Sequence, residues 1–352
     1  MARILINNCG SQAVDIIKLL KEDINNYVVY LTHQDIEKYS MADEVYKDLV
    51  FENIKDYVNW LLGMCKEHKI DVFIPFSSME RLVCFKDEFE AQHVKMLINS
   101  DSSMFACLNN KVETYKFLGK EFKRYIPLYY EVNNVKELKS AFKVLTGCHK
   151  EVCVKYASDI ASNSFRYVNF GSRDISELDV KGFDKTRKLT KTIDADVLID
   201  MFTRAYGSGN FEKSLMVMEA LTGVEVSCDC LKCGNLDLVF IRKKTDRSVQ
   251  LLTHDKKIRS VCEKILTKTG YDGPCNIQFI YDADGVPKLL EVNTRMSGGI
   301  MLSSYASGVN LPLLAVKAAL GEEVENYDYL DTKIITEKSW RFQSEYLNFW
   351  KS

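Results

Sequence analysis

The stretch Gly273–Gly299, GPCNIQFIYDADGVPKLLEVNTRMSGG, determines how the rest of the chain is interpreted. Two short runs of alternating apolar and polar residues flank the sequence DADG, and Asp-Gly readily adopts the positive φ angles of a tight β-turn. We therefore predict a β-hairpin. A turn that is symmetric about Ala283 and Asp284 places Gln278 opposite Leu289.

Alternation along the two strands predicts that one face of the hairpin is polar. Gln278, Glu291 and Asn293 share this face, because side chains point to opposite sides with period two. The other face is apolar and contains Cys275, Ile277, Phe279, Leu290 and Val292. Amide and carboxylate oxygens are ligands that suit Mg²⁺ held together with phosphate. Arg295 follows two residues after Asn293, where its guanidinium could contact a phosphate through two hydrogen bonds.

The alternative interpretation is an ordinary edge ribbon whose polar side faces solvent. The residues that follow disfavour it, because EVNTR and then SGG combine charge with backbone freedom. A solvated ribbon has no need of that combination.

The motif NIQF followed by LLEVNTRMSGG resembles the metal-binding hairpin of the ATP-grasp superfamily. It is especially similar to the branch that contains the carbamoyl phosphate synthetase large chain and biotin carboxylase. The resemblance implies that Gln278, Glu291 and Asn293 bind Mg²⁺, with Mn²⁺ as the other candidate. It also implies ATP as the nucleotide, with Arg295 contacting the transferring phosphate or the intermediate.

Composition restricts the class of protein. The 352 residues suffice for two or three domains, and 46% apolar with 27% charged residues is ordinary for a globular protein. The net charge of -2 gives no reason to expect a nucleic acid or an anionic membrane as partner. No apolar run approaches the ~20 residues of a membrane span. The 11 cysteines show no disulfide framework, which favours reduced thiols and a cytoplasmic location.

Residues 1–108 are expected to form a parallel, doubly wound, Rossmann-like domain, because strand and helix patterns alternate with short connections. Strand runs lie at 3–7, 27–31, 48–51 and 70–75, and helical patterns at 13–22, 54–68 and 79–89. The turn NNCGSQ lacks the three-glycine dinucleotide fingerprint. The resemblance implies a pre-ATP-grasp domain here that supplies part of the acceptor-substrate site. Ser77, Ser78 and Glu80, after the strand IDVFIP, either face that site or cap a helix.

Residues 109–215 are expected to form a lid subdomain. Lys111 begins a helix, and the resemblance implies that it contacts the nucleotide phosphates; the alternative is a solvated lysine. Lys155 lies inside the apolar strand EVCVKY, where an unpaired ammonium is too costly to bury, so an anion or solvent must meet it. The polar loop that follows resembles one that covers a triphosphate, with Ser162 and Ser164 as contacts. It has none of the glycines that the family usually carries there.

The strand SLMVMEA leads into the nucleotide hinge that the resemblance implies. In the family, backbone groups after such a strand bind adenine, and a later acid binds the ribose. By position the hinge residues are Glu219, Ala220 and Leu221, and the acid is Glu225. The alternative for Glu225 is an exposed strand residue.

Two further features of residues 216–352 have weaker interpretations. Arg242 and Lys243 are candidates for contact with phosphate or a carboxylate substrate, although a solvated turn is the default. The motif C-x-C-x-x-C at 228–233 lacks an evident fourth zinc ligand, which favours packed thiols. We expect a helix at 255–270, irregular structure at 302–308 and a helix at 311–320 that Asn310 caps.

These patterns predict an α/β fold with an α+β lid. The resemblance implies that residues 1–108 are a Rossmann-like pre-ATP-grasp domain, followed by a two-subdomain ATP-grasp fold with lid (109–215) and large subdomain (216–352). The implied function is an ATP-dependent carboxylate–amine or carboxylate–thiol ligase that acts through an acyl phosphate. A small-molecule kinase and a nucleotide-binding regulatory protein with a decayed site stay open as alternatives. The expected partners are small-molecule carboxylates and amines and a second copy of the chain.

Overall fold

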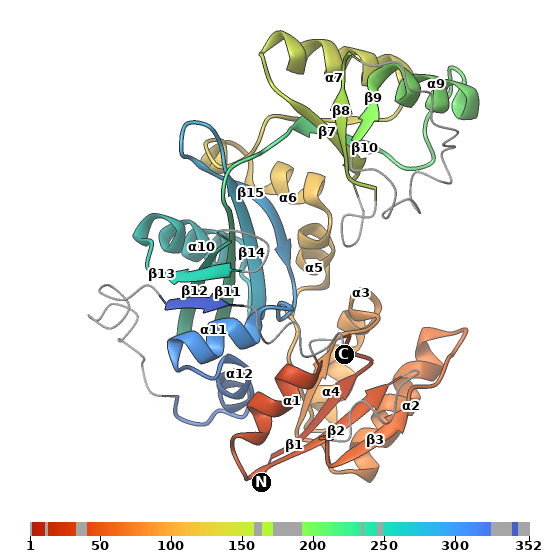
Figure 1. Cartoon of the computed structure of the whole chain (residues 1–352). Helices are drawn as coiled ribbons and strands as arrows, with labels where there is room; N and C mark the ends of the chain where they lie inside the picture. Colours follow the sequence, from red (N-terminus) through yellow and green to blue (C-terminus); the bar gives the residue numbers. More distant parts are fainter. Residues whose placement is uncertain are drawn as a thin grey trace. The chain divides into compact units, whose positions relative to one another are not determined.

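The computed structural model describes residues 2–10, 13–32, 41–157, 164–171, 192–233, 236–244, 249–324 and 340–343. The chain divides into two compact units (Figure 1). The first unit consists of Met1–Leu108, Val224–Gln278 and Val292–Ser352, and the second of Asn109–Gly223 and Phe279–Glu291. The segment Phe279–Glu291 begins and ends within the predicted hairpin, so each strand of the hairpin contributes residues to both units. Within the described ranges, no helix is long and apolar enough to cross a membrane.

The first unit begins with a five-stranded parallel sheet of order β3-β2-β1-β4-β5, as the alternating pattern predicted. Its strands are β1 (Ala2–Asn7), β2 (Asn26–Thr32), β3 (Glu44–Lys47), β4 (Val72–Pro75) and β5 (Lys95–Met96). Its helices are α1 (Ala13–Lys21), α2 (Ile54–Glu67), α3 (Met79–Leu82), α4 (Lys86–Ala91) and α5 (Ser102–Asn109). The order reverses direction at β1 and β4, which makes the carboxyl ends of these two strands the switch point of the sheet.

Two details of this sheet differ from the prediction. The third strand precedes residues 48–51, because the buried Asp48 accepts a hydrogen bond from the Tyr57 hydroxyl (3.2 Å) and the chain has left the sheet there. The helix predicted at 79–89 is broken by a 3-10 turn at Val83–Phe85. Buried side chains continue through the break at Leu82, Val83 and Phe89, so the apolar pattern alone does not reveal it.

A six-stranded sheet of order β15-β14-β11-β12-β13-β16 follows. Its strands are β11 (Glu225–Cys233), β12 (Leu236–Lys244), β13 (Val249–Thr253), β14 (Gly273–Tyr281), β15 (Pro287–Asn293) and β16 (Trp340–Gln343). The helices are α10 (Lys256–Thr269), α11 (Ile300–Ser307) and α12 (Leu311–Ala319). Asp255 caps α10 by accepting from two backbone N–H groups, and Gly270 ends it at a φ of 58°.

The helix α11 corrects the expectation of irregular structure at 302–308. Its buried residues include Ser303 and Ser304, whose hydroxyls are hydrogen-bonded in the interior. A helix face built of serines carries no apolar period, which explains the wrong prediction. In the first unit, one hydrophobic core joins α1 of the parallel sheet to β11, β12, α11 and α12.

The second unit contains a five-stranded sheet of order β6-β10-β7-β8-β9. Its strands are β6 (Tyr129–Val132), β7 (Val152–Tyr156), β8 (Arg166–Asn169), β9 (Thr192–Asp194) and β10 (Leu215–Glu219). Its helices are α6 (Lys111–Leu118), α7 (Val135–Gly147) and α9 (Ala195–Tyr206). One face of the sheet packs against α7 and α9 through Val154, Val217, Leu138 and Leu198. Side chains of odd parity on β7, including Lys155, lie on the opposite face.

The hairpin forms at β14 and β15, but its turn differs from the symmetric one expected. The Asp282 N–H donates to the carbonyl of Val286 (2.9 Å), and Gly285, at a φ of 70°, donates to the carbonyl of Asp282 (3.1 Å). The loop therefore has one residue more, with Gly285 in the left-handed region. Accordingly Leu289 is buried and Leu290 is half-buried, the reverse of the expectation. Further along β15 the alternation returns to the predicted one, with Val292 buried and Glu291 and Asn293 half-buried. That Gln278, Glu291 and Asn293 share one face stays a prediction.

Candidate nucleotide and metal site

In the second unit, α6 is docked on β15 at Lys111 and Tyr115. Asn110 caps the helix by accepting from two backbone N–H groups of its first turn. One turn further, the Tyr115 hydroxyl donates to the backbone carbonyl of Leu289 (2.7 Å). Residues four apart share a helix face, so Lys111 lies over the same strand, and its ammonium pairs with the Glu291 carboxylate.

This pair joins a predicted phosphate-binding residue to a predicted metal ligand. The side chain of Lys111 is 9% exposed and that of Glu291 is 23% exposed. Burial, and secondarily the charge of Glu291, raises the pKa of Tyr115, which keeps its hydroxyl a neutral donor. Lys111 and Tyr115 therefore both hold β15 from one face of α6.

Lys155 lies on the sheet face opposite the helices α7 and α9. It pairs across β10 with Met216, and its neighbour Cys153 pairs with Met218. All four side chains are buried. The sequence analysis did not single out the two methionines and Cys153 as neighbours of Lys155, although the alternation in VCVKY and LMVME carries that signal. Lys155 therefore shares its sheet face with soft, polarisable side chains.

Of the two serines proposed from the polar loop, only Ser164 lies among the described residues. Ser164 is fully buried, and its hydroxyl oxygen accepts a hydrogen bond from the Tyr156 N–H (2.9 Å), which fastens the end of β7. Its phosphate contact stays a prediction. Ser162 lies outside the described residues.

The hinge after β10 is fixed by hydrogen bonds at its first two residues. The Glu219 carboxylate accepts from the Leu128 N–H (2.8 Å) and pairs with the Lys150 ammonium (2.8 Å), which raises the pKa of Lys150. The Ala220 N–H donates to the carbonyl just before β7 (2.7 Å). Leu221 follows with partial exposure. The Glu219 side chain thus holds the hinge, while the backbone beyond it carries the predicted adenine contact.

Gly223 brings the end of the hinge against the hairpin. A Cβ at this position would lie 2.2 Å from the backbone oxygen of Tyr281. Only glycine permits this approach, so the segment after the hinge is fixed against β14 within the second unit.

In the first unit, Arg242 is the centre of a buried polar network. Its guanidinium donates to Asp229 (3.0 Å) and to the side chains of Ser227, Ser297, Ser303 and Gln250. Arg242 is 3% exposed and Asp229 is fully buried. A Cβ at Gly299 would lie 2.5 Å from this guanidinium. The structure thus shows Arg242 engaged by the protein, and its predicted substrate contact remains unconfirmed.

A chain of amides continues from this network along β14. Asn276 is fully buried, and its Nδ2 donates to Asp229 Oδ1 (2.9 Å). Its Oδ1 accepts from Gln278 Nε2 (3.1 Å). The sequence analysis did not single out Asn276, although its parity on the strand matches that of Gln278.

Two further candidates have acidic or basic partners on neighbouring elements. Lys243 pairs with Asp255 at the start of α10 (3.2 Å). Glu225 pairs with Lys244, the residue opposite it on β12. Both predicted ligand contacts would compete with these partly exposed ion pairs.

Arg295 lies near the switch point of the parallel sheet. Burial raises the pKa of Cys9, in the loop after β1, and the charge of Arg295 opposes that effect. The Asn7 side chain accepts from the Phe76 N–H (2.8 Å) and so ties the loop after β4 to the end of β1. Asn293, two residues before Arg295, is half-buried at the end of β15.

The three residues after β4 lie in this loop and the helix start that follows it. Ser77 and Ser78 are half-buried and Glu80 is exposed. Ser78 occupies the N-cap position of α3 and Glu80 lies in its first turn, as the helix-cap alternative expects, but Ser78, at a φ of 55°, makes no side-chain cap bond. The acceptor-site prediction for these residues is untested.

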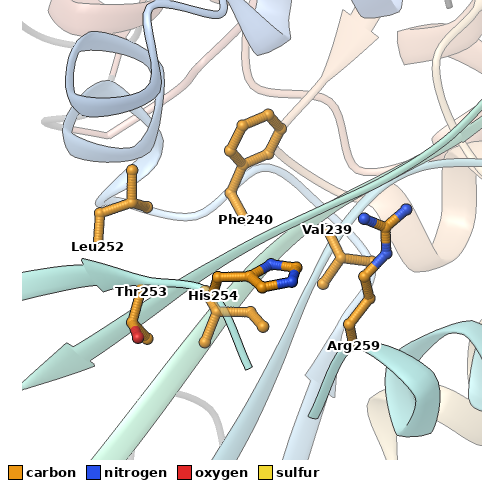
Figure 2. A pocket seen from close by; sticks show the side chains of 7 residues that line it. Val239, Phe240, Leu252, Thr253, His254 and Arg259 are labelled. Carbon is orange, nitrogen blue, oxygen red and sulfur yellow. The ribbon is translucent and has the colours of Figure 1, made fainter. Parts of the chain in front are cut away.

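Two other features include none of the predicted site residues. Cys228 and Cys230 pack in a buried cluster with Cys262 and Cys275, whose hydrogen bonds lower the pKa of Cys230 to about 6. Among the described residues, no three histidine, cysteine or acidic side chains form a group that could hold a metal ion. Figure 2 shows a pocket over β12, β13 and α10 that contains none of the predicted site residues; it is lined by Val239, Phe240, Ile241, Leu252, Thr253, His254 and Arg259.

Comparisons with known proteins agree with this arrangement. A family model described as "ATP-grasp in the biosynthetic pathway with Ter operon" matches residues 211–339. Among solved structures, biotin carboxylase from Campylobacter jejuni superimposes with a TM-score of 0.64 at 14% identity, covering 93% of this chain and 72% of that one. The fold is ATP-grasp. The ATP-grasp resemblance drawn from the hairpin motif is thereby confirmed.

Two more relatives illustrate the range of similar ATP-grasp proteins. The L-amino acid ligase from Bacillus licheniformis has a TM-score of 0.59 at 15% identity, covering 91% of this chain and 74% of that one. The carbamoyl phosphate synthase large chain of Methanothermobacter thermautotrophicus is 32% identical over 152 residues, which is 40% of this chain and 14% of that protein. Because so little of the curated relative is covered, its activity is not thereby assigned to this chain.

Proposed function

We propose that the chain is an ATP-dependent ligase that joins a small-molecule carboxylate to an amine or a thiol. The observation that carries the proposal is the contact between Lys111 and Glu291, two positions far apart in sequence whose roles the ATP-grasp pattern links. Similarity to an L-amino acid ligase and to carbamoyl phosphate synthase supports an amine as the second substrate. A homodimer is the proposed assembly.

The donor set on the hairpin fits a hard divalent cation. Gln278 donates its amide nitrogen to Asn276, which leaves its oxygen as the remaining donor atom. Glu291 supplies a partly exposed carboxylate and Asn293 a second amide. We assign Mg²⁺, or Mn²⁺, to these three residues. When bound, the metal would neutralise charge on the β- and γ-phosphates.

The remaining residues bind and orient the nucleotide. Lys111 and Lys155 offset phosphate charge, aided by Ser162 and Ser164. The backbone of Glu219, Ala220 and Leu221 binds adenine beside Met216 and Met218, and Glu225 exchanges Lys244 for the ribose hydroxyls. Catalysis by such groups is mainly positioning and electrostatic stabilisation.

Arg295 steadies the transferring phosphoryl group in this proposal. A carboxylate oxygen of the substrate attacks the γ-phosphorus, the bond to the ADP oxygen breaks, and an acyl phosphate forms. The amine or thiol then attacks the acyl carbon, expels phosphate and loses its proton. Glu80 and Lys243 are weaker candidates for the acceptor site. No step uses a covalent bond to the protein.

Calorimetric titration with ATP, with and without Mg²⁺, tests the proposal before any substrate is known. We expect Mg²⁺-dependent binding in the wild type that weakens at least tenfold in Glu291→Ala. The matched control is Glu113→Ala, an exposed acid on α6 that should leave binding unchanged. Absence of ATP binding in the wild type would contradict the ligase. ADP release is then screened over amino acids and other carboxylates, with hydroxylamine present to trap an acyl phosphate. Persistent ADP formation with no coupled amide or thioester product would favour the kinase.

A further inference from the structure

We propose that Asn276 is a positioning residue that determines which atom of the Gln278 amide faces the metal. The inference rests on the proposed function, because it assigns a role within the same donor set. Asn276 and Gln278 are two residues apart on β14, so their side chains lie on one face of the strand. The orientation of each amide is fixed by its hydrogen-bond partners: Asp229 orients Asn276, and Asn276 orients Gln278.

The orientation of Asn276 follows from its partners. The Asn276 side chain meets Asp229 Oδ1 (2.9 Å) and the carbonyl oxygen of Cys228 (3.1 Å). A carboxylate and a carbonyl only accept hydrogen bonds, so the nitrogen of Asn276 must point toward them. The hydroxyl of Ser227 (3.0 Å) completes the set. The oxygen of Asn276 is therefore turned the other way.

The orientation of Gln278 follows in turn. The oxygen of Asn276 needs a donor, and Gln278 supplies its Nε2 at 3.1 Å. The opposite end of the Gln278 amide is then its oxygen. A cation is attracted by the amide oxygen and repelled by the amide N–H groups, so only this orientation makes Gln278 a metal ligand.

Arg242 fixes the first side chain in this series of hydrogen bonds, Asp229. Its Nε and Nη2 both donate to Asp229 Oδ2, at 3.1 Å and 3.0 Å. Asp229 Oδ1 is thus left for Asn276. Because Asp229 and Asn276 are both fully buried, water does not compete for these contacts. Arg242, first considered as a substrate contact, acts on the metal donor through two intervening side chains.

A double-mutant cycle tests the inference, with Mn²⁺-dependent ATP affinity as the readout. Asn276→Ala should weaken that affinity about tenfold, because the Gln278 amide loses its preferred orientation, and should leave metal-free ATP binding unchanged. In the Gln278→Glu background the two donor oxygens are equivalent. There Asn276→Ala should leave the affinity unchanged or make it stronger.

A purely structural Asn276 predicts the same loss in both backgrounds, and that result would overturn the inference. Asn276→Ser, which keeps a donor for Asp229 but does not reach Gln278, repeats the test if the alanine variant is poorly folded. Asn134→Ala is the control, because this residue caps α7 by accepting from the Glu137 N–H. Failure of the proposed function is distinguishable, since it appears as metal-independent or absent ATP binding in the wild type itself.

Discussion

Each of the two compact units contains a buried basic side chain, and the two side chains differ in how many protein groups they contact. In the first unit, Arg242 is 3% exposed and donates to five side chains. In the second unit, Lys111 is 8% exposed, and within the described part of the chain its ammonium pairs with one carboxylate, that of Glu291. The guanidinium is saturated by the protein itself, whereas the ammonium retains donors for a ligand. Burial of a charge therefore does not distinguish a structural role from a binding role, but the number of its protein partners does.

The largest expected effect is the loss of Arg242. Arg242→Ala leaves Asp229 as an uncompensated buried charge, which should lower the free energy of unfolding by about 3–5 kcal/mol. Urea denaturation measures the change. The neighbouring Lys243→Ala should cost at most about 1 kcal/mol, because its pair with Asp255 is partly exposed. An equal loss of unfolding free energy in the two variants would contradict the view that the hydrogen bonds of the buried Arg242 matter more than the partly exposed pair of Lys243.

A second variant perturbs the same network without removing its charge. In Gly299→Ala the new Cβ would lie 2.5 Å from Arg242 Nη1, and the guanidinium is held by five partners and is not free to move. We expect a loss of about 1–3 kcal/mol in the same denaturation experiment. Gly298→Ala is the control, because its Cβ would meet no atom within 4 Å. A tolerated Gly299→Ala would show that the guanidinium can shift.

The buried thiol of Cys65, which is neutral at pH 7, makes the stability of the first unit depend on pH in alkaline solution. Burial raises the pKa of Cys65 from 9.0 to about 12. The folded state favours the neutral thiol, so this contribution is intact below pH 9 and is lost as the pH rises toward 12. By pH 10 the loss should be about 1–2 kcal/mol in the wild type. It should be smaller in Cys65→Ala, whereas a variant of the exposed Cys84 should keep the wild-type slope.

The smallest expected effect concerns the ion pair between Lys111 and Glu291. In the proposed site, a metal that binds without nucleotide has to displace the ammonium from Glu291. Lys111→Met should therefore raise the affinity for Mn²⁺ alone by about three- to tenfold, which is up to about 1.4 kcal/mol. It should also weaken ATP binding. Lys116→Met, which removes an exposed pair on the same helix, should change neither, and calorimetry distinguishes the two.

Sequence reasoning succeeded where one strong pattern decides. The hairpin depends on DADG between two alternating runs, and the strand β7 depends on the short apolar run around Lys155, whose phosphate contact stays a prediction. Both are local rules that need no knowledge of tertiary contacts. The Rossmann-like start of the chain follows equally from alternation of strands and helices.

The failures have physical causes at particular residues. Leu289 replaces Leu290 on the buried side because the turn holds one residue more than a symmetric one, and DADG is compatible with both. The helix α11 went unrecognised because its buried face includes Ser303 and Ser304. The role of Asn276 required knowing that Asp229 and Arg242 lie beside it, and strand pairing between distant segments is not written in any one window of sequence.

The hydrogen bond from Tyr115 to the carbonyl of Leu289 has a consequence for engineering. It sets the position of β15 along α6 independently of the turn that precedes the strand. Extra residues placed between Ala283 and Asp284 would lengthen the tip while Lys111 and Glu291 stay matched. Because such tips tolerate insertion, this one is suited to a fluorophore or an affinity tag on the hairpin itself.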